Sequence, residues 1–320
     1  MTIGRPKRNP IEAIKTPAFM GYVCHLAQIS YTGYQLESYF EPERIQIKDD
    51  GTRIRSGKWD RFIAGTHTPS KTARDTIYSK LGHKDALEMY FNHPIWVALA
   101  AGEFDSQYWM NFYQTLPIDI QKLIFKKNNT SGQPLVLKTI RLPTIKSILK
   151  FWNDDAFACL VALSRDSSVN IDFFAKRELP FFVHKYLQYL FEMSFFSRVT
   201  KELWEHFQHY IIPNSILSLS HHDLWTENDC YHKTMTYSRA MGVNYLKAED
   251  VCIINSKRSG NLFLYWKLFG NLKLINQELN EAFHSKNYRL PDSNKGLKWL
   301  IKQMNKHLPK SEHINATKIL

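Results

Sequence analysis

The sequence predicts a mainly α-helical protein, with a helical module over residues 17–127 followed by a larger, aromatic-rich helical domain over residues 135–320. Three observations support this fold class. Apolar residues recur at helical spacing through most of the chain. A content of 44% hydrophobic and 14% aromatic residues in 320 indicates a well-buried interior. The segment 127–134, Lys-Asn-Asn-Thr-Ser-Gly-Gln-Pro, is the most loop-like stretch and marks the domain boundary.

Residues 1–16 are predicted to form a flexible basic arm. The pentapeptide Gly4-Arg5-Pro6-Lys7-Arg8 is similar to the core of an AT-hook. That resemblance implies that Arg5, Lys7 and Arg8 enter the narrow minor groove of A·T-rich DNA, where negative potential is concentrated. The alternative is a basic tail that is simply solvated.

The elements after the arm follow from spacing and punctuation. Residues 17–40 are predicted as one helix, and helices are expected at 69–81, 85–92 and 95–101. The segment 43–51 is short and ends in Asp-Gly, so it suits either a short helix or a strand that enters a turn.

Residues 53–70 carry the most informative pattern. Trp59, Phe62 and Ile63 fall at i, i+3 and i+4 and predict one buried stripe. Gly65 suits the left-handed conformation that ends a helix. Thr68 is predicted as the N-cap of the next helix, with Pro69 at its first position.

The spacing of Phe62, Gly65 and Pro69 resembles the end of the helix-turn-helix in lambda-repressor-like (Xre-type) DNA-binding domains, over residues 42–82. The resemblance implies a DNA-reading helix that presents Arg55, Lys58 and Arg61. An ordinary surface helix with solvated cations is the alternative. The nucleic-acid contacts expected from the arm and from this module are Arg5, Lys7, Arg8, Arg53, Arg55, Lys58, Arg61, Thr68, Ser70, Lys71 and Arg74.

The second domain combines aromatic and basic segments. Its phenylalanines concentrate between residues 173 and 196, which predicts a core cluster, with a protein-partner surface or a base-stacking platform as the alternatives. A further helix is expected at 262–283. Near the C-terminus, Lys295, Lys298, Lys302 and Lys306 share one helical face that could either track a phosphate backbone or be solvated.

Two weaker patterns suggest chemistry in this domain. Arg177 and His184 satisfy the loose motif of HEPN-type ribonucleases, and that resemblance implies an RNA-cleaving pair. The residues His221, His222, Cys230 and His232 have side chains that suit zinc, although their spacing matches no known finger. No phosphate-binding loop or dinucleotide fingerprint occurs, and no cofactor is expected.

A net charge of +12 favours a polyanionic partner. The four cysteines are scattered, and neither a secretory signal nor a membrane-length apolar run is seen, so we expect a cytoplasmic protein with no membrane association. The sequence therefore predicts a protein that binds double-stranded DNA in preference to RNA. Its expected role is regulation or service in a defence or mobile-element system, and it is not expected to be an enzyme. The alternatives are an RNA-cleaving enzyme and a protein-interaction subunit of a nucleic-acid-containing assembly.

Overall fold

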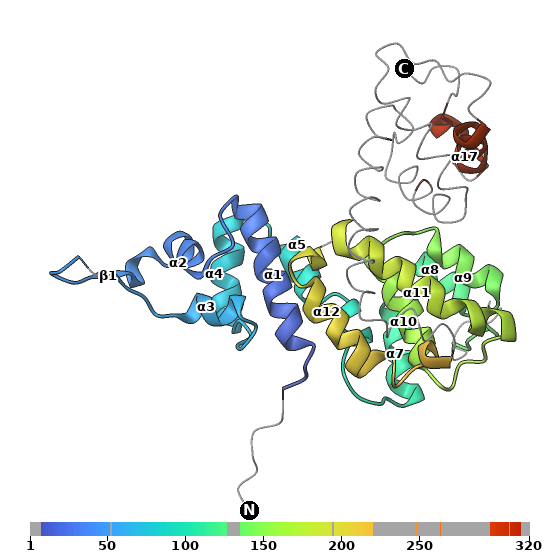
Figure 1. Cartoon of the computed structure of the whole chain (residues 1–320), viewed down its shortest axis with the longest axis horizontal. Coiled ribbons are helices and arrows are strands. Elements are labelled where there is room, and N and C mark those ends of the chain that lie inside the picture. Colours follow the sequence, from blue (N-terminus) through green and yellow to red (C-terminus); the bar gives the residue numbers. More distant parts are fainter. Residues whose placement is uncertain are drawn as a thin grey trace, which may run out of the picture. The chain divides into compact units, whose positions relative to one another are not determined.

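The computed structural model describes residues 8–51, 53–126, 135–193, 195–219, 248, 263, 295–306 and 308–314. The protein is mainly α-helical, as predicted (Figure 1). The chain divides into two compact units. The first unit comprises Met1–Phe112 and Ser194–Ser215, and the second comprises Tyr113–Met193 and Ile216–Leu320. The predicted linker at 127–134 lies outside the described residues.

The first unit takes its helices from two distant parts of the sequence. Its N-terminal part contains α1 (Glu12–Ala27), α2 (Gly33–Phe40), the 3₁₀ turn η1 (Pro42–Arg44), strands β1 (Gln46–Ile47) and β2 (Arg53–Ile54), α3 (Lys58–Ile63), α4 (Lys71–Leu81), α5 (Lys84–Phe91), α6 (Ile95–Ala98) and most of α7 (Ser106–Thr115). Its later part contributes η2 (Phe195–Arg198), α12 (Thr200–His206) and the π-helical turn η3 (Phe207–Ile211).

The predictions for the first helices need two corrections. Helix α1 begins at Glu12, so residues 12–16 are helical and do not belong to an extended arm. The predicted single helix over 17–40 is interrupted at Gln28, which has a left-handed backbone with φ of 54°. Thr32 then caps α2 by accepting a hydrogen bond from the backbone N–H of Gln35. A competent N-cap allows a second helix to start, because it satisfies a donor that the first turn leaves unpaired.

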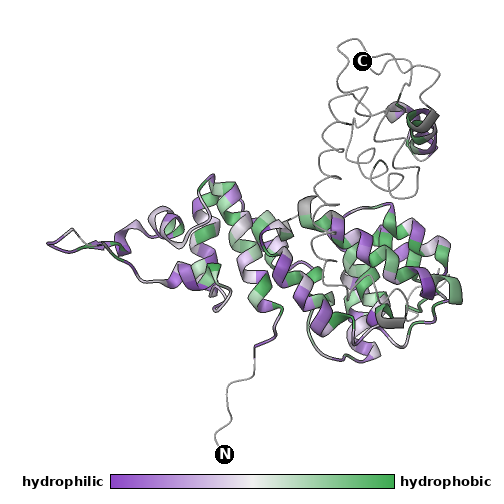
Figure 2. Ribbon diagram, viewed as in Figure 1, coloured by the Kyte–Doolittle hydropathy of each residue, from purple (hydrophilic) through white to green (hydrophobic). Residues whose placement is uncertain are grey.

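Aromatic side chains join the two parts of the first unit. Within the N-terminal part, Phe19 of α1 meets Phe91 of α5 edge to face, with ring centroids 5.1 Å apart. Trp96 of α6 meets Phe196 of η2 in a similar geometry at 5.3 Å. His206 of α12 adds a buried hydrogen bond of 2.7 Å between its Nε2 and the carbonyl oxygen of Leu99. The contacts of Phe196 and His206 explain why the segment 195–215 packs with the N-terminal helices. Figure 2 colours these elements by hydropathy.

The segment 43–51 does not form the first helix of a helix-turn-helix. Gln46 pairs with Ile54 and Ile47 with Arg53 in a short antiparallel hairpin, and Gly51 in its connection has φ of 79°. The hairpin projects from the end of the unit that carries α2 and α3 (Figure 1). The two-helix reading unit implied by the resemblance is therefore missing its first helix, and the Asp-Gly turn was the correct signal.

The second unit is built around α10 (Asp154–Arg165), which is buried along nearly its whole length. It packs against α9 (Leu142–Leu149) and α11 (Phe173–Met193). The unit also contains α8 (Ile118–Ile124) and the 3₁₀ turn η4 (Ile216–Leu219). Tyr186 of α11 donates a hydrogen bond of 2.8 Å to the carbonyl oxygen of Asn153. Helix α11 continues through Pro180 without a break.

The phenylalanine-rich region is divided by the fold. Phe182 and Phe191 lie in the core of the second unit, whereas Phe196 belongs to the core of the first. Phe173 and Phe174, at the start of α11, are exposed. The prediction of a single core cluster over 173–196 is therefore wrong at its two ends.

The described C-terminal residues form α17 (Lys295–Asn305), which carries the lysine stripe, and the 3₁₀ turn η5 (Lys310–Glu312). The helix predicted at 262–283 lies outside the described residues, apart from Phe263. Within the described part of the chain, no helix is both long enough and apolar enough to span a bilayer.

Candidate nucleic-acid interface

Helix α3 is held by a buried aromatic stack. Trp59 is fully buried and lies 5.2 Å from Phe40 of α2 in a stacked arrangement. Phe62 meets the same indole edge to face at 5.7 Å. The predicted burial of Trp59 and Phe62 is thus confirmed, while Ile63 is only half-buried. Burial of these rings fixes which side of α3 faces solvent.

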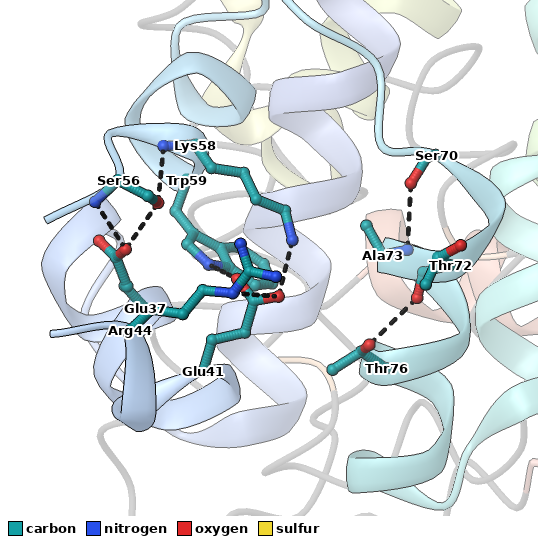
Figure 3. Close-up of polar contacts among 10 residues, drawn as sticks. All are labelled: Glu37, Glu41, Arg44, Ser56, Lys58, Trp59, Ser70, Thr72, Ala73 and Thr76. Atoms are coloured by element: carbon teal, nitrogen blue, oxygen red, sulfur yellow. Dashed lines mark hydrogen bonds and ion pairs between the residues drawn. The ribbon is translucent and has the colours of Figure 1, made fainter.

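Lys58, the first residue of α3, and Arg55, in the segment before α3, both pair with carboxylates within the protein. Lys58 Nζ lies 2.8 Å from Glu41 Oε1, and the indole N–H of Trp59 donates to the other oxygen of Glu41 at 3.0 Å (Figure 3). Arg44 approaches the same carboxylate at 3.6 Å (Figure 3). Burial raises the pKa of Glu41, but Lys58, the Trp59 donor and the Arg44 charge outweigh it and leave that pKa below its ordinary value.

Arg55 is held in the same way on the other side of the turn. Its guanidinium lies 2.9 Å from Asp60 and 4.0 Å from Glu37, whose side chain is fully buried. Glu37 also accepts hydrogen bonds from the backbone N–H and the hydroxyl of Ser56, at 3.0 and 2.7 Å (Figure 3). Arg55 and Lys58 both pair with Glu37 or Glu41 at the end of α2, so they tie α2 to the start of α3. Their contact with DNA stays a prediction.

Arg8 also has an internal role. Its guanidinium donates to the carbonyl oxygens of Gly65 and Glu12 and to the hydroxyls of Thr16 and Thr68. It therefore ties the start of α1 to the connection between α3 and α4, and its entry into a DNA groove stays a prediction. Arg5 and Lys7, and the side chain of Arg53, lie outside the described residues.

The connection between α3 and α4 turns at Gly65 as predicted, but the N-cap of α4 lies two residues later than predicted. Gly65 has φ of 68°, the left-handed conformation that ends α3. Ser70, and not Thr68, is the N-cap of α4: its hydroxyl accepts a hydrogen bond of 3.2 Å from the backbone N–H of Ala73 (Figure 3). Pro69 is buried, and it lies outside α4 because it precedes the N-cap Ser70. Thr68 instead bridges Arg8 and Glu12.

The cations that remain exposed lie on either side of this connection. Arg61 near the end of α3 and Lys71 at the start of α4 are both exposed. Among the described residues, neither makes an ion pair. Arg74, one turn further along α4, packs 4.5 Å from the Phe91 ring centroid and donates to the carbonyl oxygen of Pro69 at 2.9 Å. Of the predicted contacts, Arg61, Thr68, Ser70 and Lys71 are thus exposed.

The carboxylates that neutralise Arg55 and Lys58 were not foreseen from the sequence. Glu37 lies 18 residues before Arg55 and Glu41 lies 17 residues before Lys58, and no local pattern links them. The one available signal was their position on an otherwise apolar helix end, where an acidic residue needs a partner.

Arg177 and His184 lie in different environments. Arg177 is exposed and pairs with Glu178 at 3.0 Å. His184 is buried, and burial, aided by the Lys185 charge, lowers its pKa to about 4. Its imidazole is therefore neutral near neutral pH, whereas a general acid uses the protonated ring.

The candidate metal ligands His221, His222, Cys230 and His232 lie outside the described residues. Within the described ranges, no three histidine, cysteine or acidic side chains gather as a metal site would require. The described cysteines, Cys24 and Cys159, are both buried thiols.

No protein-family model, curated protein or solved structure shows significant similarity to this chain.

Proposed function

We propose that the first unit binds double-stranded DNA through the α3–α4 edge, defined as Arg61, Thr66, His67, Ser70 and Lys71. One observation carries the proposal. The inner cations Arg55 and Lys58 are matched with carboxylates, whereas those at this edge stay exposed on a chain of net charge +12. All five residues of the edge are exposed.

The edge suits a phosphate backbone for physical reasons. Lysine and arginine that neutralise phosphates release condensed counterions, which supplies sequence-independent affinity. The Ser70 hydroxyl accepts a hydrogen bond from the Ala73 N–H and keeps its own proton to donate, and hydroxyl groups are common partners of phosphate oxygens. Arg61 is also the residue type that pairs best with a guanine in the major groove. The edge is kept in place by the buried Trp59 and by the Arg8 bonds to the connection.

A duplex-binding unit joined to a second helical unit is an organisation that suits a regulator or a component of a defence or mobile-element system. This is the biological role that we propose. DNA is favoured over RNA because a short helix end suits a B-form groove, whereas the major groove of A-form RNA is too narrow for side chains to read.

The test compares two double variants with equal charge loss. R61Q/K71Q removes both cations of the edge, and K80Q/K84Q removes two exposed lysines at the far end of α4 and the start of α5. Lys80 lies about 14 Å along α4 from Lys71, given a rise of about 1.5 Å per residue.

Binding to a labelled duplex is measured by fluorescence anisotropy over a salt series. We expect R61Q/K71Q to weaken binding and to reduce the slope of log K against log salt by about 2, since each phosphate contact contributes about 0.9. K80Q/K84Q is expected to keep the wild-type slope. If the two variants bind the duplex equally well, the α3–α4 edge is not the DNA-binding site.

A second function is favoured by a separate observation in the second unit. Phe173 and Phe174 are 73% and 59% exposed, and their rings lie 5.7 Å apart. Exposed paired aromatics at a helix start are typical of a protein-partner surface. In this function the protein is an interaction subunit of an assembly that already contains nucleic acid.

A further inference from the structure

Helix α17 has two sharply different sides. Leu297, Leu300 and Met304 are fully buried. Lys302 and Lys306 are exposed and Lys298 is half-buried. At about 100° per residue, these three lysines fall within an arc of about 80° on the opposite side of the helix. Successive lysines in the row are separated by about 6 Å along the axis, which is of the order of the separation between neighbouring phosphates of a nucleic-acid strand.

The lysines line a groove, and none of the described residues in its lining is acidic. The groove has a volume of about 430 Å³, and its lining consists of Lys298, Ile301, Lys302, Asn305, Lys306 and Ile314. One wall is the segment that returns after α17. Asn305 fastens it through two hydrogen bonds of 2.8 Å, one to the carbonyl oxygen and one from the N–H of Ile314. The groove is thus a built feature, with apolar walls and a cationic rim.

A tryptophan flanks the lysine row. Trp299 is 38% exposed, whereas its neighbours Leu297 and Leu300 are fully buried. On the helix it lies about 20° beyond Lys306, so the indole borders the row. An exposed indole beside a row of cations is the combination that binds single strands, because the cations follow the backbone and the ring stacks on a base.

We infer that α17 and its return segment form a binding surface for single-stranded nucleic acid. Lys298, Lys302 and Lys306 contact successive phosphates, and Trp299 stacks on one base. An anionic membrane suits this helix less well, since an interfacial helix inserts its apolar side, and here that side is already buried within the protein. This inference is independent of the α3–α4 edge and concerns a different ligand.

The experiment uses the full-length protein and a labelled oligothymidylate, which has no secondary structure. K302Q/K306Q removes the two exposed lysines of the row, and K80Q/K84Q serves again as the control of equal charge loss. We expect K302Q/K306Q to reduce the salt slope for the single strand by about 1.4, at about 0.7 for each lost contact. W299A is expected to weaken binding at least about fivefold, and W299F to restore most of it by keeping an aromatic ring.

Each outcome is decisive. Unchanged single-strand binding in K302Q/K306Q, or an equal loss in the control, would overturn the inference. So would a finding that the variant loses binding to phosphatidylserine vesicles but not to the oligothymidylate. If R61Q/K71Q leaves duplex binding unchanged while K302Q/K306Q loses the single strand, the proposed function fails and this inference stands. Circular dichroism of each variant checks that the helices are retained.

Discussion

Replacing Gly65 with alanine tests how the α3–α4 edge is held on α1. Gly65 has φ of 68°, and a Cβ built on it would lie only 2.2 Å from the carbonyl oxygen of Ala13 and 3.0 Å from Pro17 Cγ. The left-handed backbone alone costs an alanine about 1–2 kcal/mol. Reduced freedom of the unfolded chain returns about 0.4–1 kcal/mol of this. Overlap with a backbone atom adds about 1–3 kcal/mol, because the helix itself has to move.

Gly82 provides a matched control in the same unit. It also has φ of 68°, but a Cβ there would meet no atom within 4 Å. G82A is therefore expected to lower the free energy of unfolding by about 1 kcal/mol, and G65A by about 2–4 kcal/mol. Urea unfolding followed by circular dichroism compares the two midpoints in the transition of the first unit. If G65A is no less stable than G82A, then Gly65 does not lie against the Ala13 carbonyl of α1 as described.

Two further predictions concern the second unit. The pKa of His184 is lowered to about 4 from 6.5 by burial, so the unfolded chain binds more protons between these pH values. The free energy of unfolding therefore has its full value above pH 6.5 and falls by up to about 3 kcal/mol toward pH 4. Denaturant unfolding at several pH values measures this profile, and H184Q should flatten it. An H184Q profile equal to that of the wild type would refute the reasoning. For the partner surface, F173S/F174S should abolish any association that persists at high salt in size-exclusion chromatography, while changing stability by less than about 0.5 kcal/mol because both rings are exposed. Salt-resistant association that survives this double substitution would locate the partner surface elsewhere.

Local features of the chain were determined by the sequence. Gly65 and Gly82 end α3 and α4 with left-handed backbones. Trp59 and Phe62 are buried at their predicted spacing. These features could be predicted because each depends on the residue itself and on neighbours within one helical turn. The mainly α fold class follows from the same short-range periodicity.

Only the tertiary structure decided which cations are available. Arg8, Arg55 and Lys58 read as surface charges, yet each is held by groups that approach from 4 to 60 residues away. The same long-range packing places Phe196 in the first unit and leaves Phe173 exposed. A charge is available for a ligand only if no internal partner has taken it. Those partners are set by how the helices pack, because groups distant in sequence meet only after the chain has folded.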